Sequence, residues 1–490
     1  MHCSDGYKRI RDVPVDLEER GTIMEEKESK NTSSWSTGKK VGVIVAAVIV
    51  IYALISVFFH FHFFPGTEIN GYKCGFHSVG KVKEMIEKGV GEYTISITER
   101  DDKKESVASS DVGLTFVDDG RLEKIKEGQK AYAWITFPFI NKKYSDGVTL
   151  EVDETSYENA LNGLNAFDEN QVVAPVDAWS QYNEETNSYD IVDEIYGNTV
   201  KKEEFYTALK EAIIRQDDSI DIEEAGCYEN PAYTKDSEEV LQSNDTLNKY
   251  VSTDIVYDFD DRTQELTGST INKWLSVTKK FKVKVNEDKA AKYVAKLADK
   301  YDTVGIERHF TSIAGNDIDV KGGTYGWTID QKAETAKLVK QIKKGKKVTR
   351  EPEYSHYAKS RKKNDIGDTY VEVDLGSQHM WFYKNGETVV STPVVTGNTS
   401  LGRGTPTGVY YILYKTTNYT LTGQGYASPV DYWLPFTHSG VGIHDSSWRS
   451  SYGGSIYTYD GSHGCVNTPY DAVKTIYNNI ESTYPVVVHW

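Results

Sequence analysis

Two short stretches near the C-terminus decide how this sequence is interpreted: Gly442-Ile443-His444-Asp445, and Ser462-His463-Gly464-Cys465-Val466-Asn467. They bring one thiol close in sequence to two imidazoles. A cysteine attacks carbonyl carbon as its thiolate, and a neighbouring histidine can take the thiol proton at neutral pH. Residues 445–461 are enough chain to leave one strand and return beside it. We therefore predict Cys465 as a nucleophile, with His444 and His463 as candidate bases.

Two further interpretations of this region stay open. Gly464 permits a backbone conformation that other residues avoid, so the N–H groups of Gly464 and Cys465 can point to one place where an oxyanion forms. Alternatively, His444, Asp445, His463 and Cys465 form a zinc site. His463 and Cys465 are only two positions apart, which suits joint ligation poorly on an extended strand, so we expect no metal.

The sequence around these stretches has the pattern of a mostly β domain covering residues 367–490. Alternating apolar residues predict strands, and Lys384-Asn385-Gly386-Glu387 is a hairpin turn signal. One segment has the spacing of a helix. We expect strands at 370–375, 389–395, 409–413 and 485–488, and a helix at 471–480.

These motifs together resemble the L,D-transpeptidase family, which has a YkuD-type catalytic domain. The resemblance extends upstream to residues 378–383, 394–397 and 405–408, so that it covers essentially all of 367–490. It implies an enzyme that cross-links peptidoglycan without metal or organic cofactor. Such an enzyme takes a tetrapeptide stem as acyl donor, releases the terminal D-alanine, and transfers the acyl group to an amine of another stem.

The resemblance also implies roles for single residues. Cys465 is the nucleophile that forms a thioester, and His444 is the base, with its ring oriented by a nearby carbonyl such as that of Asp445. His463 is the second candidate and is expected to support the site. The candidate substrate-binding residues are Trp448, Arg449, Ser462 and Asn467.

Two of these assignments have ordinary alternatives. Arg449 either pairs with a stem carboxylate or is a surface arginine. Three aromatic residues on the preceding loop either close over the donor or only pack the loop: Tyr426, Tyr432 and Trp433.

Composition limits the partners of the chain. With 490 residues it is too long for one core, and we expect several folded units. Its formal net charge of -17 opposes nucleic-acid binding, so we expect no nucleic-acid partner. Four cysteines are too few for a disulfide scaffold, and we expect Cys74 and Cys227 to be unpaired buried thiols.

Residues 41–64 are predicted to form a single transmembrane helix. The run has no charged residue and is long enough to cross a bilayer. Lys39 and Lys40 precede it, whereas the first lysine after it is Lys73, so the positive-inside rule places residues 1–40 in the cytoplasm. The rest of the chain is then expected outside the cell membrane, facing the cell wall.

The segment between the anchor and the catalytic domain is predicted to hold two α+β modules, at 65–165 and 166–345. The resemblance implies that they bind peptidoglycan. Strands are expected at 93–97, 131–135, 189–192 and 219–222, and helices at 82–86, 203–215, 287–301 and 333–342. The order strand, helix, strand recurs, which suggests a diverged duplication. Residues 346–366 are predicted as a basic linker, and the basic run that it continues is either solvated or docks on an anionic wall or membrane surface.

The predicted fold class is therefore multidomain: a transmembrane helix, α+β modules and a mostly β catalytic domain. The leading function is a membrane-anchored L,D-transpeptidase acting on peptidoglycan stem peptides. Two alternatives remain: an L,D-carboxypeptidase that trims stems with water, and a non-catalytic protein that binds the cell wall.

Overall fold

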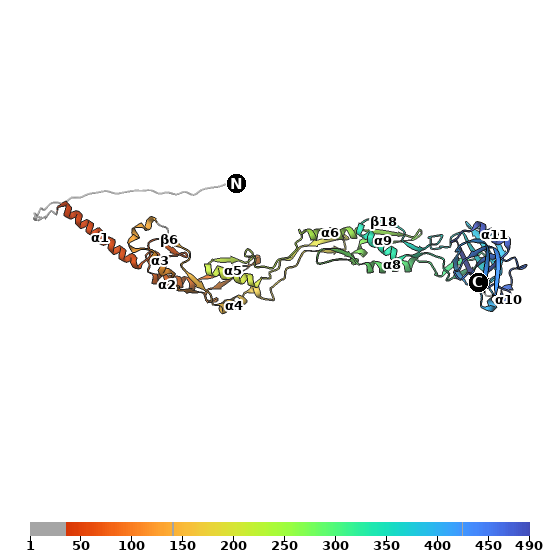
Figure 1. Ribbon diagram of the computed structural model, residues 1–490, viewed down its shortest axis with the longest axis horizontal. Helices are drawn as coiled ribbons and strands as arrows, with labels where there is room; N and C mark the ends of the chain where they lie inside the picture. Colours follow the sequence, from red (N-terminus) through yellow and green to blue (C-terminus); the bar gives the residue numbers. More distant parts are fainter. Residues whose placement is uncertain (1–35, 140–141, 424) are drawn as a thin grey trace, which may run out of the picture. The chain divides into compact units, whose positions relative to one another are not determined.

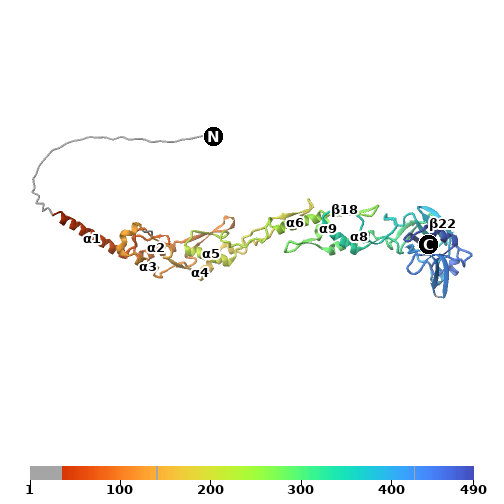
Figure 2. The same cartoon turned by 45° about the horizontal axis from the view of Figure 1, so that its top comes forward.

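The computed structural model describes residues 36–139, 142–423 and 425–490. The chain divides into two compact units. The first holds residues up to Gln171 together with Lys201–Cys227, and the second holds Val172–Val200 together with Tyr228–Trp490. Figures 1 and 2 show the order of the elements along the chain.

Helix α1, Thr37–Phe61, is long and apolar enough to cross a membrane, and the side chains of its most apolar stretch are not buried. It is the one such helix in the described part of the chain. The helix ends three residues before the predicted span does. Phe63 and Phe64 are instead buried in the first unit, where Phe64 N–H donates to Gln129.

The first unit is built around a helix and a three-stranded sheet. Helix α2, Val79–Gly91, is capped by the Ser78 hydroxyl and buries Val82, Ile86 and Val90, so the predicted helix is confirmed. In the sheet, β3 (Thr94–Thr98) lies between antiparallel β4 (Lys104–Ala108) and parallel β10 (Ser219–Asp221). The remaining elements are β1 Thr67–Ile69, β2 Tyr72–Lys73, η1 Arg100–Asp102, β5 Thr115–Val117, α3 Arg121–Gly128, η2 Ala131–Phe139, β6 Lys142–Tyr144, β7 Thr149–Glu151, α4 Glu154–Asn162, η3 Asn165–Phe167 and α5 Lys202–Arg215.

The strand predicted at 131–135 is wrong, because this segment forms the 3-10 helix η2. Its aromatic residues do not alternate between two faces of a sheet. Trp134 instead packs against Tyr52 and Phe59 of α1, with ring centroids 5.7 and 6.2 Å away. Contact with an apolar helix therefore explains the pattern that suggested a strand.

The second module repeats this arrangement. Helix α6 (Glu238–Val251) leads into β11 (Asp254–Asp258), which lies between antiparallel β12 (Thr263–Leu266) and parallel β18 (Lys347–Arg350). The predicted helices are confirmed as α8 (Glu287–Tyr301) and α9 (Gln331–Lys344), which lie beside each other in Figures 1 and 2. Its other elements are α7 Gly268–Ile271, η4 Asn272–Trp274, β13 Leu275–Val277, β14 Val283–Val285 and β17 Thr328–Ile329.

The shared topology indicates a duplication between residues 79–221 and 238–350, whereas the predicted repeat is wrong, because its segment at 189–222 supplies α5 and β10 to the first module itself. In both modules a helix precedes the central strand, an antiparallel strand follows it, and a later helix leads into a strand parallel to it. The pairs β5 with β7 and β13 with β14 occupy the same place in the order, as do helices α4 and α8, and helices α5 and α9.

Each module also carries a hairpin between its last two helices. In the first, β8 (Trp179–Asn183) and β9 (Ser188–Val192) belong to the second unit, where the Asn248 side chain bonds the backbone of Tyr189 twice, at 2.7 and 2.9 Å. Helix α5 and β10 stay in the first unit because β10 pairs with β3. The predicted module at 166–345 had grouped them with later elements.

The hairpin of the second module packs on the catalytic domain. It consists of β15 (Arg308–Thr311) and β16 (Asp317–Val320). Phe310, Val320 and Tyr325 form one apolar cluster with Ile366, Val409 and Val487. Backbone bonds add to this contact, since Tyr325 N–H donates to the Val409 carbonyl and Val409 N–H donates to that of Gly322.

The basic segment after α9 is not a solvated linker. β18 belongs to a sheet, and β19 (Tyr354–His356) pairs with β17. Arg361 is buried, and its guanidinium lies over the rings of Phe259, Trp327 and Tyr354 at 4.4 to 5.2 Å. Aromatic faces attract such a cation, so Arg361 packs against these rings and is not solvated.

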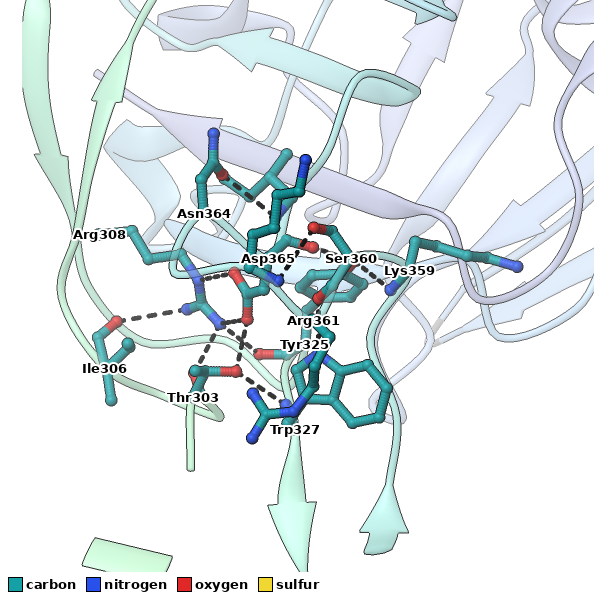
Figure 3. A network of polar contacts seen from close by, with 12 residues as sticks. Thr303, Ile306, Arg308, Tyr325, Trp327, Lys359, Ser360, Arg361, Asn364 and Asp365 are labelled. Atoms are coloured by element: carbon teal, nitrogen blue, oxygen red, sulfur yellow. Dashed lines mark hydrogen bonds and ion pairs between the residues drawn. The ribbon is translucent and has the colours of Figure 1, made fainter. Parts of the chain in front are cut away.

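A buried ion pair fixes the end of this segment to the hairpin (Figure 3). Arg308 donates to both carboxylate oxygens of Asp365, at 2.8 and 2.9 Å, and to the carbonyls of Thr303 and Tyr325, at 2.5 and 2.9 Å. Both charged side chains are almost fully buried. Burying two charges is costly, and the complete set of hydrogen bonds offsets that cost.

The catalytic domain consists of two sheets with helix α11 (Tyr470–Asn479) between them in the core. One sheet has the order β22-β21-β20-β28-β23 and the other β24-β25-β26-β27. At the predicted hairpin turn, Asn385 and Gly386 both have positive φ, 54° and 82°, as a two-residue turn requires. The elements are β20 Tyr370–Asp374, β21 His379–Lys384, β22 Glu387–Pro393, η5 Thr399–Leu401, β23 Gly408–Tyr411, β24 Thr416–Gly423, β25 Tyr426–Pro435, β26 Gly442–Asp445, α10 Ile456–Tyr459, β27 Val466–Thr468 and β28 Pro485–His489.

Two cysteines outside this domain carry no bridge. Cys74 and Cys227 are both buried and unpaired, as predicted. Burial raises the pKa of both thiols, that of Cys74 to about 11, so they behave as small apolar side chains.

Candidate active site

Two neighbouring strands bring the predicted site residues together. β26 and β27 run parallel, and their register places His444 beside Asn467. Cys465 is the residue just before β27, at the end of the loop that returns from residue 445. A cleft of about 220 Å³ opens here, lined by Leu421, Tyr426, Ser428, His444, Trp448, Arg449, Gly461, Ser462, His463, Cys465 and Asn467.

His444 is buried, and its surroundings fix its protonation. Its Nδ1 lies 2.7 Å from the Asp445 carbonyl oxygen, which can only accept, so Nδ1 carries the hydrogen and Nε2 is the basic nitrogen. Burial lowers the pKa of His444 to about 4. The bond to Asp445 and its carboxylate oppose that shift, while Arg449 adds to it. His444 is therefore a neutral base at physiological pH.

A chain of polar side chains continues from Nε2. With its amide oriented to satisfy both neighbours, Asn467 donates to His444 Nε2 at 3.2 Å and accepts from Arg449 Nε at 2.6 Å. Arg449 also donates to the carboxylate and carbonyl of Asp460, at 3.0 and 2.5 Å. The Arg449 side chain is only 9% exposed. Both sequence alternatives for Arg449 therefore miss its contacts, because it is neither a surface arginine nor left free for a substrate carboxylate.

The thiol of Cys465 lies half-buried in the same cleft. Its Sγ is 3.6 Å from the Gly440 carbonyl oxygen, to which it donates. Burial raises the pKa of Cys465 to about 11, and a backbone hydrogen bond at Gly442 partly offsets this. Cys465 is thus a protonated thiol at neutral pH, and such a thiol needs a base before it can attack as a thiolate.

The loop before the thiol is held by its own hydrogen bonds. Gly464 has φ +127°, a conformation that favours glycine. Its N–H donates to the Ser462 hydroxyl at 3.0 Å, and that hydroxyl donates to the Cys465 carbonyl at 2.6 Å. Thr405 donates to the Gly464 carbonyl at 2.7 Å. Of the two amides predicted to face an oxyanion, that of Gly464 is already engaged, and Ser462 is engaged with the loop.

His463 occupies a different position from His444. Its side chain is exposed, and Nε2 lies 2.7 Å from Arg403 Nη1. An arginine only donates, so this nitrogen accepts and its lone pair is occupied. Its ring also lies 4.8 Å from that of Tyr426. The two histidines that the sequence presented as alternatives are thus distinguished by burial and by partner.

The aromatic residues near the cleft divide into two groups. Tyr426 lines the cleft, and Trp448 lies 5.9 Å from the His444 ring with half of its surface exposed. Tyr432 packs against Tyr470 and Tyr477, and Trp433 is buried. Only the first group can contact a ligand.

The zinc interpretation requires a cluster of ligands. Among the residues that the structure describes, no group of three or more His, Cys, Asp and Glu side chains is arranged to hold a metal ion. The Asp445 carboxylate accepts from Tyr432 N–H at 2.8 Å instead.

Sequence analysis missed several residues of the site, among them Arg403, Asp460 and Gly442. Arg403 and Asp460 stand in loops without motif, and only the fold brings them to His463 and Arg449. Gly442 belongs to a quoted stretch, but its backbone contact with the thiol depends on the register of β26 and β27.

Two family models match this chain. Residues 368–488 match YkuD, the L,D-transpeptidase catalytic domain, and residues 233–350 match a model described as "Putative peptidoglycan binding domain". Together they define a cell-wall enzyme with a binding module and a catalytic domain. The predicted fold class is confirmed for the peptidoglycan-binding region and for the catalytic domain.

Solved structures agree with these matches. A mutant of the Enterococcus faecium L,D-transpeptidase is 36% identical over 51% of this chain and 100% of its own, with a TM-score of 0.46. The catalytic domain of the E. faecium enzyme, acylated by ertapenem, is 45% identical over 25% of this chain and 98% of its own, with a TM-score of 0.24. No curated protein sequence matches the chain. On the sequence identities and the family models, the chain belongs to the L,D-transpeptidase family.

Proposed function

We propose that the protein is a membrane-anchored L,D-transpeptidase that cross-links peptidoglycan stems through a thioester on Cys465. The observation that carries this proposal is the pairing of a protonated thiol with a neutral, oriented imidazole in one cleft. Neither group is reactive by itself, and proton transfer between them generates the nucleophile only during attack.

In the first half-reaction the donor stem lies in the cleft with its scissile carbonyl at Cys465. His444 Nε2 gives up its bond from the Asn467 amide and takes the thiol proton as sulfur attacks, and the Asp445 carbonyl stabilises the imidazolium through the Nδ1–H bond. The Cys465 N–H supports the oxyanion. The imidazolium then protonates the leaving D-alanine amine, and the acyl group remains on sulfur as a thioester.

In the second half-reaction the amine of another stem attacks the thioester. His444 takes the proton of the incoming amine and returns it to the departing sulfur, so no proton is lost. Water in place of the amine gives the L,D-carboxypeptidase alternative with the same residues. Trp448, which is exposed, and Tyr426, which is half-buried, are the aromatic cleft residues available to hold the acceptor or donor. The remaining predicted site residues have positioning roles. The loop is positioned by His463, Ser462 and Gly464, and the base by Arg449 and Asn467.

Product analysis tests the reaction. The full chain in detergent is incubated with a disaccharide-tetrapeptide, and products are identified by mass. A cross-linked dimer that has lost one D-alanine is expected, and a tripeptide alone would favour the carboxypeptidase. No product, together with no mass adduct from ertapenem, would overturn the proposal. Ertapenem is an informative probe because it acylates the related E. faecium catalytic domain.

We also propose that α1 spans the cell membrane with residues 1–40 in the cytoplasm. Lys39 and Lys40 at its N-terminal end support this orientation. Labelling Cys465 in intact cells with a membrane-impermeant carbapenem conjugate tests it. Labelling only after the membrane is broken would contradict the orientation.

A further inference from the structure

A groove runs between helices α8 and α9 of the second module. It has a volume of about 700 Å³ and a floor of small or apolar side chains. Its residues are Glu287, Ala291, Gln331, Lys332, Thr335, Ala336, Val339, Lys340 and Lys343. Ala291 and Ala336 leave space between the two helices, and the lysines stand along one edge.

The groove lysines are free cations within the described part of the chain. Lys332, Lys340 and Lys343 are exposed and belong to no ion pair there. Lys337 on the same helix, outside the groove, is paired with Glu353. In a protein of net charge -17, three unpaired lysines along one groove form a local site for an anion.

The equivalent helices of the first module, α4 and α5, carry different side chains where they face each other. Helices α5 and α9 both end at a left-handed residue, Gln216 or Gly345. Counting back from these residues, Tyr206 stands where the second module has Thr335. Its ring packs edge-on against Tyr157 of α4, 4.7 Å away, and fills the space between the helices.

The charges of the first module also differ. Counting back in the same way, Glu203, Glu211 and Ile214 stand where the second module has Lys332, Lys340 and Lys343. Lys210 of α5 pairs with Glu154 of α4 across the helices. The two modules therefore differ in the charge of this helix pair, since among the described residues the second has unpaired lysines where the first has two glutamates and an isoleucine.

We propose that the groove between α8 and α9 binds peptidoglycan by the carboxylates of its stem peptides. The lysines complement those carboxylates, and the shallow floor of Ala291, Ala336 and Val339 accepts an extended peptide. The lining contains no aromatic side chain on which a sugar would stack, which favours the peptide over the glycan. The assignment rests on the proposed cell-wall function and names the surface through which it is exercised.

Sedimentation with purified sacculi tests the groove. The full chain in detergent is mixed with sacculi stripped of teichoic acid, and the bound fraction gives an apparent Kd. The triple variant Lys332→Gln, Lys340→Gln, Lys343→Gln is expected to bind about tenfold more weakly, because exposed ion pairs each contribute modestly. A control variant with the same charge change, Lys284→Gln, Lys292→Gln, Lys296→Gln, is expected to bind normally; these lysines are exposed but lie outside the groove.

A second variant tests shape without changing charge. Thr335→Tyr introduces the side chain that fills the first module, and it is expected to weaken binding several-fold. Equal loss in the groove and control variants would overturn the proposal, as would unchanged binding in both groove variants. Full groove-dependent binding to glycan strands freed of peptides by an amidase would also overturn it, as would a loss seen only on walls that retain teichoic acid.

The enzyme assay separates this proposal from the catalytic one. On soluble disaccharide-tetrapeptide the groove variants are expected to keep normal rates, because the groove does not contain cleft residues. Cys465→Ala is expected to bind sacculi normally and to form no product. Each proposal can therefore fail while the other holds.

Discussion

The catalytic cleft and the α8–α9 groove are two hollows of one unit that are built in opposite ways. In the cleft, the polar side chains around the base are buried and bonded to one another, as His444, Asn467 and Arg449 show. In the groove, the charged side chains are exposed and lack ion-pair partners among the described residues. Chemistry needs groups held in place before substrate arrives, whereas attachment to a polymer tolerates mobile cations.

The largest effect is expected for Cys465→Ala, which should abolish the function of the cleft and leave that of the groove intact. Product formation should fall by about 10⁴-fold or more, because removing the nucleophile leaves only binding and the oxyanion contact. Binding to sacculi should not change. Mass analysis of products and sedimentation measure the two. Activity within tenfold of wild type would reject the thioester mechanism.

Next in size is the difference between the two histidines. His444→Ala should lower the rate by about 10³-fold, within the range for a lost general base. His463→Ala should cost about tenfold or less, because its Nε2 is bonded to Arg403 and the ring is exposed. Rates of acylation by ertapenem measure both, and the reverse order would reassign the base.

The pH dependence of acylation tests the cleft alone. His444 is neutral above its pKa of about 4, so the rate should fall only as pH drops toward that value. Asn467→Ala removes a bond to the neutral imidazole, which raises the pKa of His444 and moves the acid limb to higher pH. An unmoved or lower acid limb in that variant would show that Asn467 does not bond the base.

A smaller effect is expected for Arg449→Lys. Lysine keeps the charge but cannot bond Asn467 and Asp460 together, so the rate should fall by about tenfold while sacculus binding is unchanged. Arg403→Lys offers a matched control at the other histidine. A loss of binding in Arg449→Lys would mean that the cleft itself contributes to wall attachment.

The smallest effect is expected for a single lysine of the groove, and it measures how much one charge contributes to sacculus binding. Lys340→Gln alone should weaken sacculus binding by about twofold to threefold, as one exposed ion pair contributes little, and should leave the rate unchanged. Raising the salt concentration should reduce the difference between this variant and wild type. A difference that persists in high salt would point to a shape effect instead.

Sequence reasoning reached the local elements better than the contacts between them. Period and turn signals predicted α8 and the hairpin at Asn385, because both depend on neighbouring residues. The aromatic run at 131–135 was mistaken for a strand, since its partner is α1. Arg361 was assigned to solvent because two of its three aromatic partners, Phe259 and Trp327, are distant in sequence.

The site follows the same division. Motif and resemblance predict roles for Cys465 and His444, because those roles depend on residue type and spacing. The engagement of Gly464 N–H and of Arg449 could not be predicted, because each depends on how one loop folds back on itself. The sequence signal for the groove was partial, since only Lys343 belongs to the locally basic run, and the other lining residues come together where α8 packs beside α9.

The burial of the Cys465 thiol has a consequence for its chemical durability. Peroxides and other oxidants react with the thiolate, and oxidation beyond the sulfenic acid is generally irreversible. With its pKa raised to about 11, the sulfur is almost entirely protonated at neutral pH, so it is a poor target for oxidants. In the proposed mechanism the thiolate exists only while His444 holds the proton, which protects the sulfur between turnovers.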